Sequence, residues 1–276
     1  MSTVAQLLTD AAIAGDESRR DAEIFLGHCL DKPRSWLYTW PDAELDVVTI
    51  TEFSRLMDAR KKGCPVAYLI GRRGFWTLNL QVNQHTLIPR PETEMLVEWA
   101  LELDLSPAAK VLDLGTGCGA IALALASEKP NWRIVGVDAS EPALDVARRN
   151  AIELQLESVQ FVQSNWYDAV PNEHFGLLIS NPPYIEPGDV HLSQGDLRFE
   201  PTSALQAQDA GFADLMTLIE GAPAHISSGS YLLLEHGYQQ GGRVRELLAQ
   251  RGFMQIESRC DLAGQERVSG GCWNAQ

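Results

Sequence analysis

The chain of 276 residues is long enough for one large or two ordinary domains, because domains commonly contain about 100–200 residues. Its 45% hydrophobic and 21% charged residues argue against a disordered, fibrous or membrane-embedded protein. Residues 1–90 carry 11 of the 22 Lys+Arg and 11 of the 37 Asp+Glu, so their charges balance. The whole net charge of −15 therefore lies in residues 91–276. This acidic part is unfavourable for binding duplex nucleic acid, because such affinity comes largely from Lys and Arg.

Short amphipathic helices are expected in the first part of the chain. Apolar residues recur at helical spacing between residues 2 and 62, for example at Val4, Leu7, Leu8 and Ala11. We therefore predict a small helical domain.

The next segment, residues 74–90, has the pattern of a strand. Leu78, Leu80 and Val82 alternate with polar residues, which is the period of a half-buried strand. This segment is expected to form a hairpin that links two domains.

Apolar runs alternate with amphipathic segments throughout the rest of the chain, a pattern that predicts βαβ units around a parallel sheet. Strands are expected at residues 110–115, 133–138, 159–164, 175–180, 230–235 and 253–258, and helices at 92–103, 119–128, 141–154 and 244–252.

Neither a membrane anchor nor a metal centre is expected. The first residues lack a basic segment followed by a long apolar stretch, and no apolar run reaches the roughly 20 residues of a membrane helix. The five cysteines are odd in number and form no CxxC pair, which argues against a disulfide framework and a zinc site. A cytoplasmic protein is the expectation.

A glycine-rich turn follows the first predicted strand of the sheet. Gly115, Gly117 and Gly119 occupy alternating positions in DLGTGCG, directly before a predicted helix. Glycine permits positive φ and a close approach of ligand to backbone, and free amides at a helix start can receive an anionic group. The turn predicts a nucleotide or nucleoside site.

Asp138 ends the second predicted strand, 19 residues after Gly119. A carboxylate at this place can accept hydrogen bonds from both hydroxyls of a ribose, although Ser140 and Glu141 also allow a helix cap. The glycine spacing fits a dinucleotide fingerprint as well, so an oxidoreductase stays open at this point. Asp113 favours a nucleoside that carries an amino acid, because its carboxylate suits an ammonium group better than a pyrophosphate.

The corner Asn181-Pro182-Pro183-Tyr184 follows a buried strand and is rich in acceptors. An amino group has two donor hydrogens, which the Asn181 side-chain oxygen and the Pro182 carbonyl can each accept, leaving the nitrogen lone pair free. These bonds strengthen as positive charge develops on the nitrogen, and Tyr184 offers a flat face for a planar group. An ordinary proline turn is the alternative.

Several segments carry a resemblance to known families. DLGTGCG (113–119) resembles the first motif of class I S-adenosylmethionine-dependent methyltransferases, and NPPY (181–184) resembles the fourth motif of those acting on adenine N6 or glutamine side-chain amides. With residues 63–98 and 195–205, these motifs are similar to the HemK family, the release-factor glutamine methyltransferases, over essentially the whole chain.

The resemblance implies methylation of N5 of the glutamine in the Gly-Gly-Gln (GGQ) loop of peptide chain release factors. S-adenosyl-L-methionine would be the donor, S-adenosyl-L-homocysteine the product, and no metal would take part. It implies a Rossmann-like α/β sheet flanked by helices, with residues 1–73 as a helical substrate-recognition domain, 74–90 as a β-hairpin linker and 91–276 as the catalytic domain. A monomer without membrane or nucleic-acid partners is expected.

The resemblance also assigns site residues. Cofactor contacts are expected from Gly115, Thr116, Gly117, Cys118, Gly119, Asp138, Trp166 and Asn181. The glutamine is expected to be held by Asn181, Pro182, Pro183 and Tyr184. A core tryptophan is the alternative for Trp166, and the roles of Arg90 and Glu92 are left open, either at the domain junction or on the substrate.

Two related activities stay open as alternatives, an N6-adenine nucleic-acid methyltransferase and a ribosomal-protein glutamine methyltransferase. The acidic second part of the chain disfavours the first of them. An oxidoreductase or a nucleotide-binding module would leave the NPPY corner unexplained.

Overall fold

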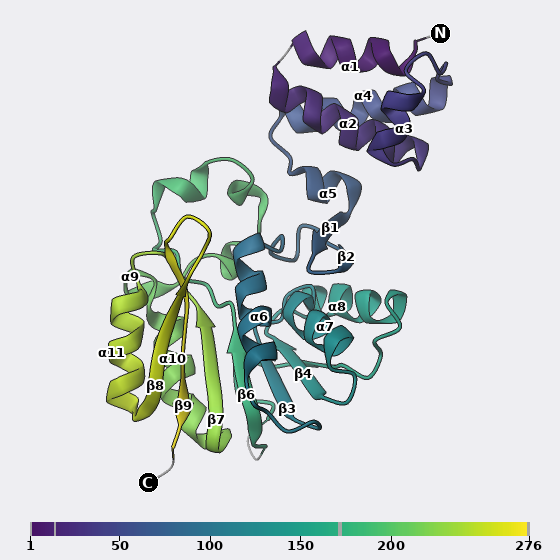
Figure 1. The fold of residues 1–276 in the computed structure, drawn as a ribbon. Coiled ribbons are helices and arrows are strands. Elements are labelled where there is room, and N and C mark those ends of the chain that lie inside the picture. Colours follow the sequence, from purple (N-terminus) through teal and green to yellow (C-terminus); the bar gives the residue numbers. More distant parts are fainter. Residues whose placement is uncertain (1, 14, 171–172, 275–276) are drawn as a thin grey trace. The chain divides into compact units, whose positions relative to one another are not determined.

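The computed structural model of the protein describes residues 2–13, 15–170 and 173–274, and the chain forms two compact units (Figure 1). The first unit comprises residues 1–71 and the second residues 72–276, so the segment 74–90 lies within the second unit.

The first unit is helical, as its apolar spacing predicts. Phe25, Leu26 and Leu56 are fully buried in its core, and the side chain of Asp46 caps the last long helix by accepting a hydrogen bond of 2.7 Å from Thr49 N. Its helices are α1 (Val4–Ile13), α2 (Asp16–Leu30), α3 (Arg34–Thr39), α4 (Val47–Lys61) and α5 (Val66–Ile70).

The second unit begins with an antiparallel hairpin of β1 (Arg72–Phe75) and β2 (Leu78–Gln81), in which Phe75 pairs with Leu78. In the described residues that follow, seven strands form one sheet in the order β5-β4-β3-β6-β7-β9-β8. These strands are β3 (Lys110–Leu114), β4 (Arg133–Asp138), β5 (Gln160–Gln163), β6 (Phe175–Ser180), β7 (Ile226–Glu235), β8 (Phe253–Cys260) and β9 (Glu266–Trp273).

Helices lie on both faces of this sheet (Figure 1). The α-helices are α6 (Glu94–Glu102), α7 (Ala120–Glu128), α8 (Glu141–Glu153), α9 (Gln208–Gly211), α10 (Ala213–Gly221) and α11 (Gly241–Arg251). The 3-10 turns are η1 (Pro91–Thr93), η2 (Val190–Ser193), η3 (Leu197–Phe199), η4 (Thr202–Ala204) and η5 (Ala222–Ala224). Leu112 and Leu114 of β3 are buried in one core with Leu215 of α10 and Leu248 of α11.

The sheet is mixed, which corrects the expectation of a parallel sheet through the last third of the chain. β3 to β7 pair in parallel, but β9 pairs antiparallel with both β7 and β8. The turn of residues 261–265 between β8 and β9 is too short for the crossover that parallel pairing requires.

Two of the longer elements were missing from the sequence prediction, α10 and β9. Leu215, Leu218 and Ile219 of α10 are buried at helical spacing, so a signal was present for this helix. The segment of β9 reads ERVSGGCW and contains two glycines, which are unfavourable in strands. Gly270 is required there by close packing, because a Cβ atom would lie 2.4 Å from Leu233 Cδ2 and 2.7 Å from Leu232 O.

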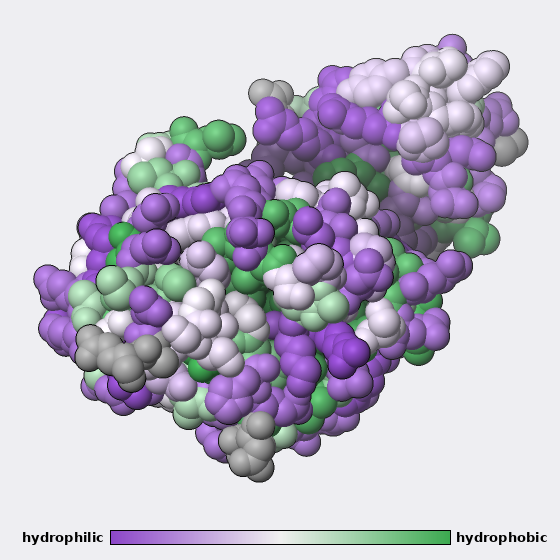
Figure 2. Space-filling view, turned by 60° about the horizontal axis from the view of Figure 1, so that its bottom comes forward, coloured by the Kyte–Doolittle hydropathy of each residue, from purple (hydrophilic) through white to green (hydrophobic). Residues whose placement is uncertain are grey.

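The surface is mostly polar. Figure 2 shows one face of the molecule, on which hydrophilic residues predominate and hydrophobic residues form separate smaller patches. Within the residues that the structure describes, every helix is too short or too polar to span a lipid bilayer.

The close approach of β9 to β7 predicts the effect of a small substitution. Gly270→Ala should lower the free energy of unfolding by about 1–3 kcal/mol, because the added methyl overpacks against Leu232 and Leu233. Gly74→Ala is the matched control, since nothing lies within 4 Å of its Cβ position, and it should cost less than about 0.5 kcal/mol. Denaturant unfolding followed by tryptophan fluorescence measures both, and equal losses would contradict the packing constraint.

Candidate active site

Three strand ends that carry polar groups or glycine meet at one edge of the sheet. β3 lies between β4 and β6, and its last residue, Leu114, is in register with Val137 of β4 and Ser180 of β6. The chain also reverses its strand order between β3 and β6, and ligands of open α/β sheets bind at such a point. The glycine turn, Asp138 and Asn181 are therefore neighbours, as the sequence predicts.

The glycine turn has a backbone that other residues rarely adopt. Gly115, Gly117 and Gly119 have φ values of 76°, 58° and 85°. A Cβ atom at Gly119 would lie 3.0 Å from Leu123 Cδ1, whereas nothing lies within 4 Å of a Cβ position at Gly117. Gly119 thus allows close packing of the following helix, and Gly117 leaves bare backbone beside open space.

Asp113 lies beneath this turn and holds it. Its carboxylate is fully buried, and Oδ2 accepts hydrogen bonds from Thr116 Oγ1 (2.6 Å) and Ala122 N (3.3 Å). Among the described residues Oδ1 has no partner, and burial raises the pKa of this carboxyl group to about 7. Asp113 is not part of the cavity wall, so the structure does not support a direct contact between Asp113 and a ligand ammonium.

Asp138 connects the end of β4 to both neighbouring turns. Its Oδ2 accepts a hydrogen bond from Gly117 N and its Oδ1 accepts one from Ser140 N, each at 2.9 Å. The side chain therefore fixes the turn before α8, whose N-cap is Ser140, and it also lines the cavity described below. Each oxygen keeps a further lone pair for a ligand hydroxyl. Burial raises the pKa of Asp138 above its ordinary value.

The side chains of the NPPY corner are oriented by residues distant in the sequence. Asn181 Nδ2 donates a hydrogen bond of 3.0 Å to Thr93 Oγ1, and Tyr184 Oη donates one of 3.1 Å to Glu235 Oε1. Because the amide is planar, the first bond turns Asn181 Oδ1 away from Thr93. The backbone carbonyl of Tyr184 accepts from Gln240 Nε2 at 3.2 Å.

A cavity of about 440 Å³ opens at this edge of the second unit. Of the residues predicted for the site, Gly115, Gly117, Asp138, Trp166, Asn181 and Pro183 line it. Residues that the sequence analysis did not select also line it, among them Leu87, Ser164, Ser203 and Asp214. A smaller cavity of about 60 Å³ shares Asn181 and is lined by Pro182, Tyr184 and Arg90.

Three predicted residues of the glycine turn, Thr116, Cys118 and Gly119, are not part of either wall. Thr116 is bonded to Asp113, as described above. Cys118 is buried, and its carbonyl accepts a hydrogen bond of 2.9 Å from Asn150 Nδ2. These residues shape the turn from behind.

Trp166 lies against the glycine turn in a strained conformation. Its φ is 50°, and its ring carbons are 3.4 and 3.7 Å from the position of a Cβ at Gly115. Left-handed backbone at a bulky residue tends to mark functional sites. A hydrogen bond with Trp166 lowers the pKa of Asp214, although burial raises it overall. Asp214 lies in the first turn of α10. The sequence analysis did not predict this helix, and for that reason it did not select Asp214 as a site residue.

Arg90 holds together two segments of the cavity wall. It forms an ion pair with Glu200, whose side chain is fully buried, and the second oxygen of Glu200 accepts a 3.0 Å hydrogen bond from Ile88 N. The bonds connect the segment around residues 84–90 to that around 197–205 within the second unit. Arg90 therefore has a structural role in the wall, whichever ligand occupies the cavities.

No group of three or more His, Cys, Asp and Glu residues in the described part of the chain is arranged to hold a metal ion. The five cysteines are free thiols.

The fold and the position of the cavity define the class of protein. Residues 91–199 match the family model described as methyltransferase small domain. The crystal structure of a methyltransferase from Pyrococcus furiosus shares the fold, with a TM-score of 0.56 and 18% sequence identity over 80% of this chain and 100% of that one. The second unit is a methyltransferase domain.

Similarity to known proteins over the whole chain shows which family of methyltransferases it belongs to. Residues 2–71 match the family model of the PrmC N-terminal domain. A release factor glutamine methyltransferase from Shewanella oneidensis is 47% identical over 95% of this chain and 92% of the relative, and one from Pseudomonas aeruginosa is 47% identical over 99% of each chain. The chain belongs to the release factor glutamine methyltransferase family.

The buried Asp113 predicts a pH dependence of stability. Its folded-state pKa of about 7 exceeds the ordinary value of 3.8, so the folded protein holds this proton more tightly than the unfolded chain. The free energy of unfolding should therefore fall by an amount on the order of 4 kcal/mol as pH rises from about 4 to about 7. Urea unfolding between these pH values should show a smaller decrease for Asp113→Asn. An identical pH slope in both proteins would contradict the assignment of this proton to Asp113.

Proposed function

We propose that the protein transfers a methyl group from S-adenosyl-L-methionine to the side-chain N5 of the glutamine in the GGQ loop of peptide chain release factors. One observation carries the chemistry. Asn181, directly after β6, donates its Nδ2 hydrogen to Thr93, its oxygen accepts no hydrogen bond from the residues that the structure describes, and it lines both the larger and the smaller cavity. Membership of the family supports the choice of substrate.

The larger cavity suits the cofactor by its donors and its charge. Carboxylates of Asp138 and Asp214 line it, and they favour a ligand that carries positive charge and hydroxyl groups. When bound, S-adenosyl-L-methionine supplies an electrophilic methyl group on a positively charged sulfur. We propose that Asp138 accepts its ribose hydroxyls, that Trp166 packs on its adenine and that the turn Gly115–Gly119 approaches it with bare backbone. Thr116 and Cys118 would act through the shape of that turn.

The smaller cavity suits the acceptor amide. The Asn181 side-chain oxygen and the Pro182 carbonyl would each accept one hydrogen of the glutamine NH2 group, and Tyr184 would pack against its plane. Pro183 keeps the corner rigid, since proline fixes its own φ. The nitrogen lone pair is then free to attack the methyl carbon.

Catalysis in this arrangement comes from positioning and electrostatics. The amide nitrogen bonds to the methyl carbon while the carbon–sulfur bond breaks and the sulfur keeps the electron pair. Positive charge develops on the nitrogen, and the two acceptor oxygens stabilise it more strongly in the transition state than in the ground state. One N–H proton is released to water.

The rest of the chain fits this proposal. We propose that the protein acts as a monomer. We propose that the helical part, residues 1–73, recognises the protein substrate, and that residues 74–90 link it to the catalytic part, residues 91–276. Because release factors act on ribosomes, we place the reaction in the cytoplasm.

The proposal predicts which substrate takes up label. Purified protein incubated with methyl-labelled S-adenosyl-L-methionine should label a wild-type release factor and leave a Gln→Ala variant of its GGQ loop unlabelled. A ribosomal-protein fraction and DNA are incubated in parallel. Label in the ribosomal fraction alone would indicate a ribosomal-protein glutamine methyltransferase, and label in DNA alone would indicate an N6-adenine methyltransferase; either would overturn the release-factor substrate.

Two substitutions should separate acceptor chemistry from cofactor binding. Asn181→Ala should lower kcat by about 10²–10³-fold, because one of the two acceptors for the amide is lost. Its Kd for the cofactor, measured by calorimetry, should change by less than about threefold. Asp138→Ala should raise that Kd by about 10–100-fold through lost hydrogen bonds and leave kcat at saturating cofactor less affected. The reverse pattern would contradict both assignments.

A further inference from the structure

Another buried carboxylate, besides Asp113 and Glu200, lies beside the NPPY corner. Glu235 is the last residue of β7, and the parallel pairing of Ser180 with Leu234 places it next to Asn181 at the same edge of the sheet. Its side chain is almost completely buried and is not part of either cavity wall. It therefore contacts neither ligand of the reaction proposed above.

Glu235 and Thr93 each bond to one of the two side chains that would hold the acceptor amide. Tyr184 Oη donates to its Oε1 at 3.1 Å, and Asn181 Nδ2 donates to Thr93 Oγ1 at 3.0 Å. The Thr93 hydroxyl lowers the pKa of the Glu235 carboxyl group, whereas Glu235 Oε2 is buried and has no hydrogen-bond partner among the described residues. The four side chains thus form two hydrogen-bonded pairs, and the unpaired Glu235 Oε2 is an acceptor available to the Thr93 hydroxyl.

We propose that Glu235 is a positioning residue that sets the direction of these hydrogen bonds, so that the Asn181 oxygen faces the acceptor amide. The proposal rests on the function proposed above and extends it to a residue that touches neither substrate nor cofactor.

The direction of these hydrogen bonds matters because the Asn181 side-chain amide can be flipped by half a turn and still fill nearly the same space. An amide presents oxygen on one side and NH2 on the other, and a hydroxyl such as that of Thr93 can donate or accept. An ionised carboxylate has no proton and can only accept. When Thr93 donates to Glu235, its oxygen is left to accept from Asn181 Nδ2, and Asn181 Oδ1 must face the opposite way.

Protonation of Glu235 removes this constraint, because a carboxylic acid can donate to Thr93, and Thr93 can then donate to the oxygen of a flipped Asn181. Burial raises the pKa of Glu235 to about 7, and the negative charge of Glu92 raises it as well. Hydrogen bonds from Thr93 and Tyr184 and the positive charge of Arg267 act in the opposite direction. Turnover should therefore fall as pH drops through about 7, where the carboxylate gains its proton.

The test uses substitutions that keep shape and change only hydrogen-bonding capacity. Glu235→Gln introduces a donor, and it should lower kcat by about 10²-fold while KM and the Kd for the cofactor stay within about threefold of wild type. Its kcat should also lose the acid limb of the pH profile. Intact cofactor binding shows that the variant is folded.

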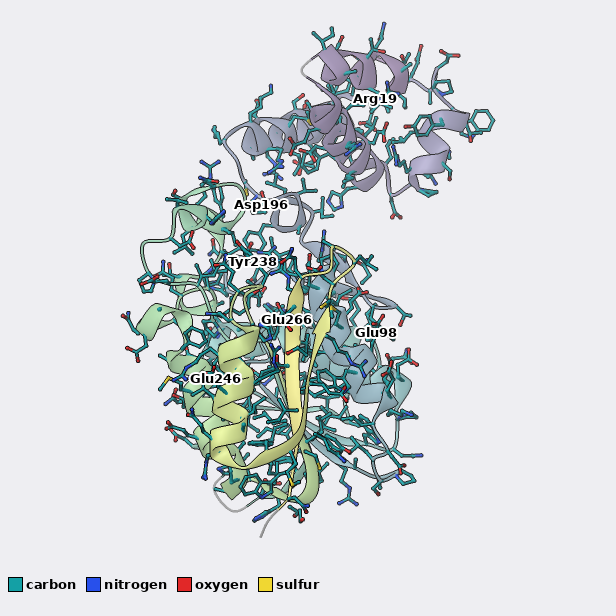
Figure 3. All side chains as sticks on the ribbon, turned by 60° about the vertical axis from the view of Figure 1, so that its left-hand side comes forward. Arg19, Glu98, Asp196, Tyr238, Glu246 and Glu266 are labelled. Atoms are coloured by element: carbon teal, nitrogen blue, oxygen red, sulfur yellow. The ribbon has the colours of Figure 1, made fainter. Side chains whose placement is uncertain are left out.

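Thr93 supplies the second arm of the test. Thr93→Val, which lacks the hydroxyl, should resemble Glu235→Gln, and Thr93→Ser, which keeps it, should restore most of the activity. The double variant Glu235→Gln/Thr93→Val should be no slower than either single variant, because both break the same contact. Glu266→Gln is the matched control. Glu266, labelled in Figure 3, begins β9, the strand next to β7, and pairs with Arg245 of α11, so this variant should stay within about twofold of wild type.

The outcomes separate this proposal from the preceding one. If wild-type protein methylates the release factor but Glu235→Gln keeps a kcat within threefold of wild type, or keeps its acid limb, Glu235 has no positioning role. Additive losses in the double variant would overturn the proposal as well. Absence of transfer to the release factor by wild-type protein would instead overturn the proposed function.

Discussion

The parallel pairing of β3 with both β4 and β6 is the constraint on which the site depends. It aligns Leu114 with Val137 and with Ser180, so the residues that follow all three strands emerge side by side. The glycine turn, Asp138 and Asn181 are far apart in the sequence, and each has an ordinary structural alternative as a turn or a cap. Their meeting at the reversal of strand order supports the proposal that cofactor and acceptor bind side by side at this edge.

Buried carboxylates organise the loops around this edge. Asp113 holds the glycine turn through Thr116, Glu200 holds the cavity wall through Arg90 and Ile88, and Glu235 holds Tyr184. Burying a carboxylate is unfavourable unless it is hydrogen-bonded, and the raised pKa values of Asp113 and Glu235 express that cost. The hydrogen bonds of these carboxylates fix the geometry of the loops, and a reaction that depends on positioning requires such fixed geometry.

The side chains of this edge divide into two sets. Asp138, Trp166 and Asn181 line the cavity. Asp113, Thr116 and Glu235 lie outside its wall, where the first two stabilise the glycine turn and Glu235 accepts a hydrogen bond from Tyr184. The sequence motif DLGTGCG does not separate cavity-lining residues from supporting residues, because Gly115 lines the cavity and the neighbouring Asp113 does not. Burial and hydrogen bonding distinguish them, and they predict different effects of substitution on binding, turnover and stability.

The sequence by itself determined the helical first unit, the strands from β3 to β8, and the turns that carry the predicted site. Apolar periodicity, glycine and proline act over a few residues, so they can be read without knowing the fold. The tertiary structure alone decided that β9 enters antiparallel between β7 and β8, where close packing and not strand propensity selects Gly270. It also decided which side chains orient the site. Thr93 and Asn181 are 88 residues apart, Tyr184 and Glu235 are 51 apart, and Arg90 and Glu200 are 110 apart. Such pairs follow from strand order, which local periodicity does not encode.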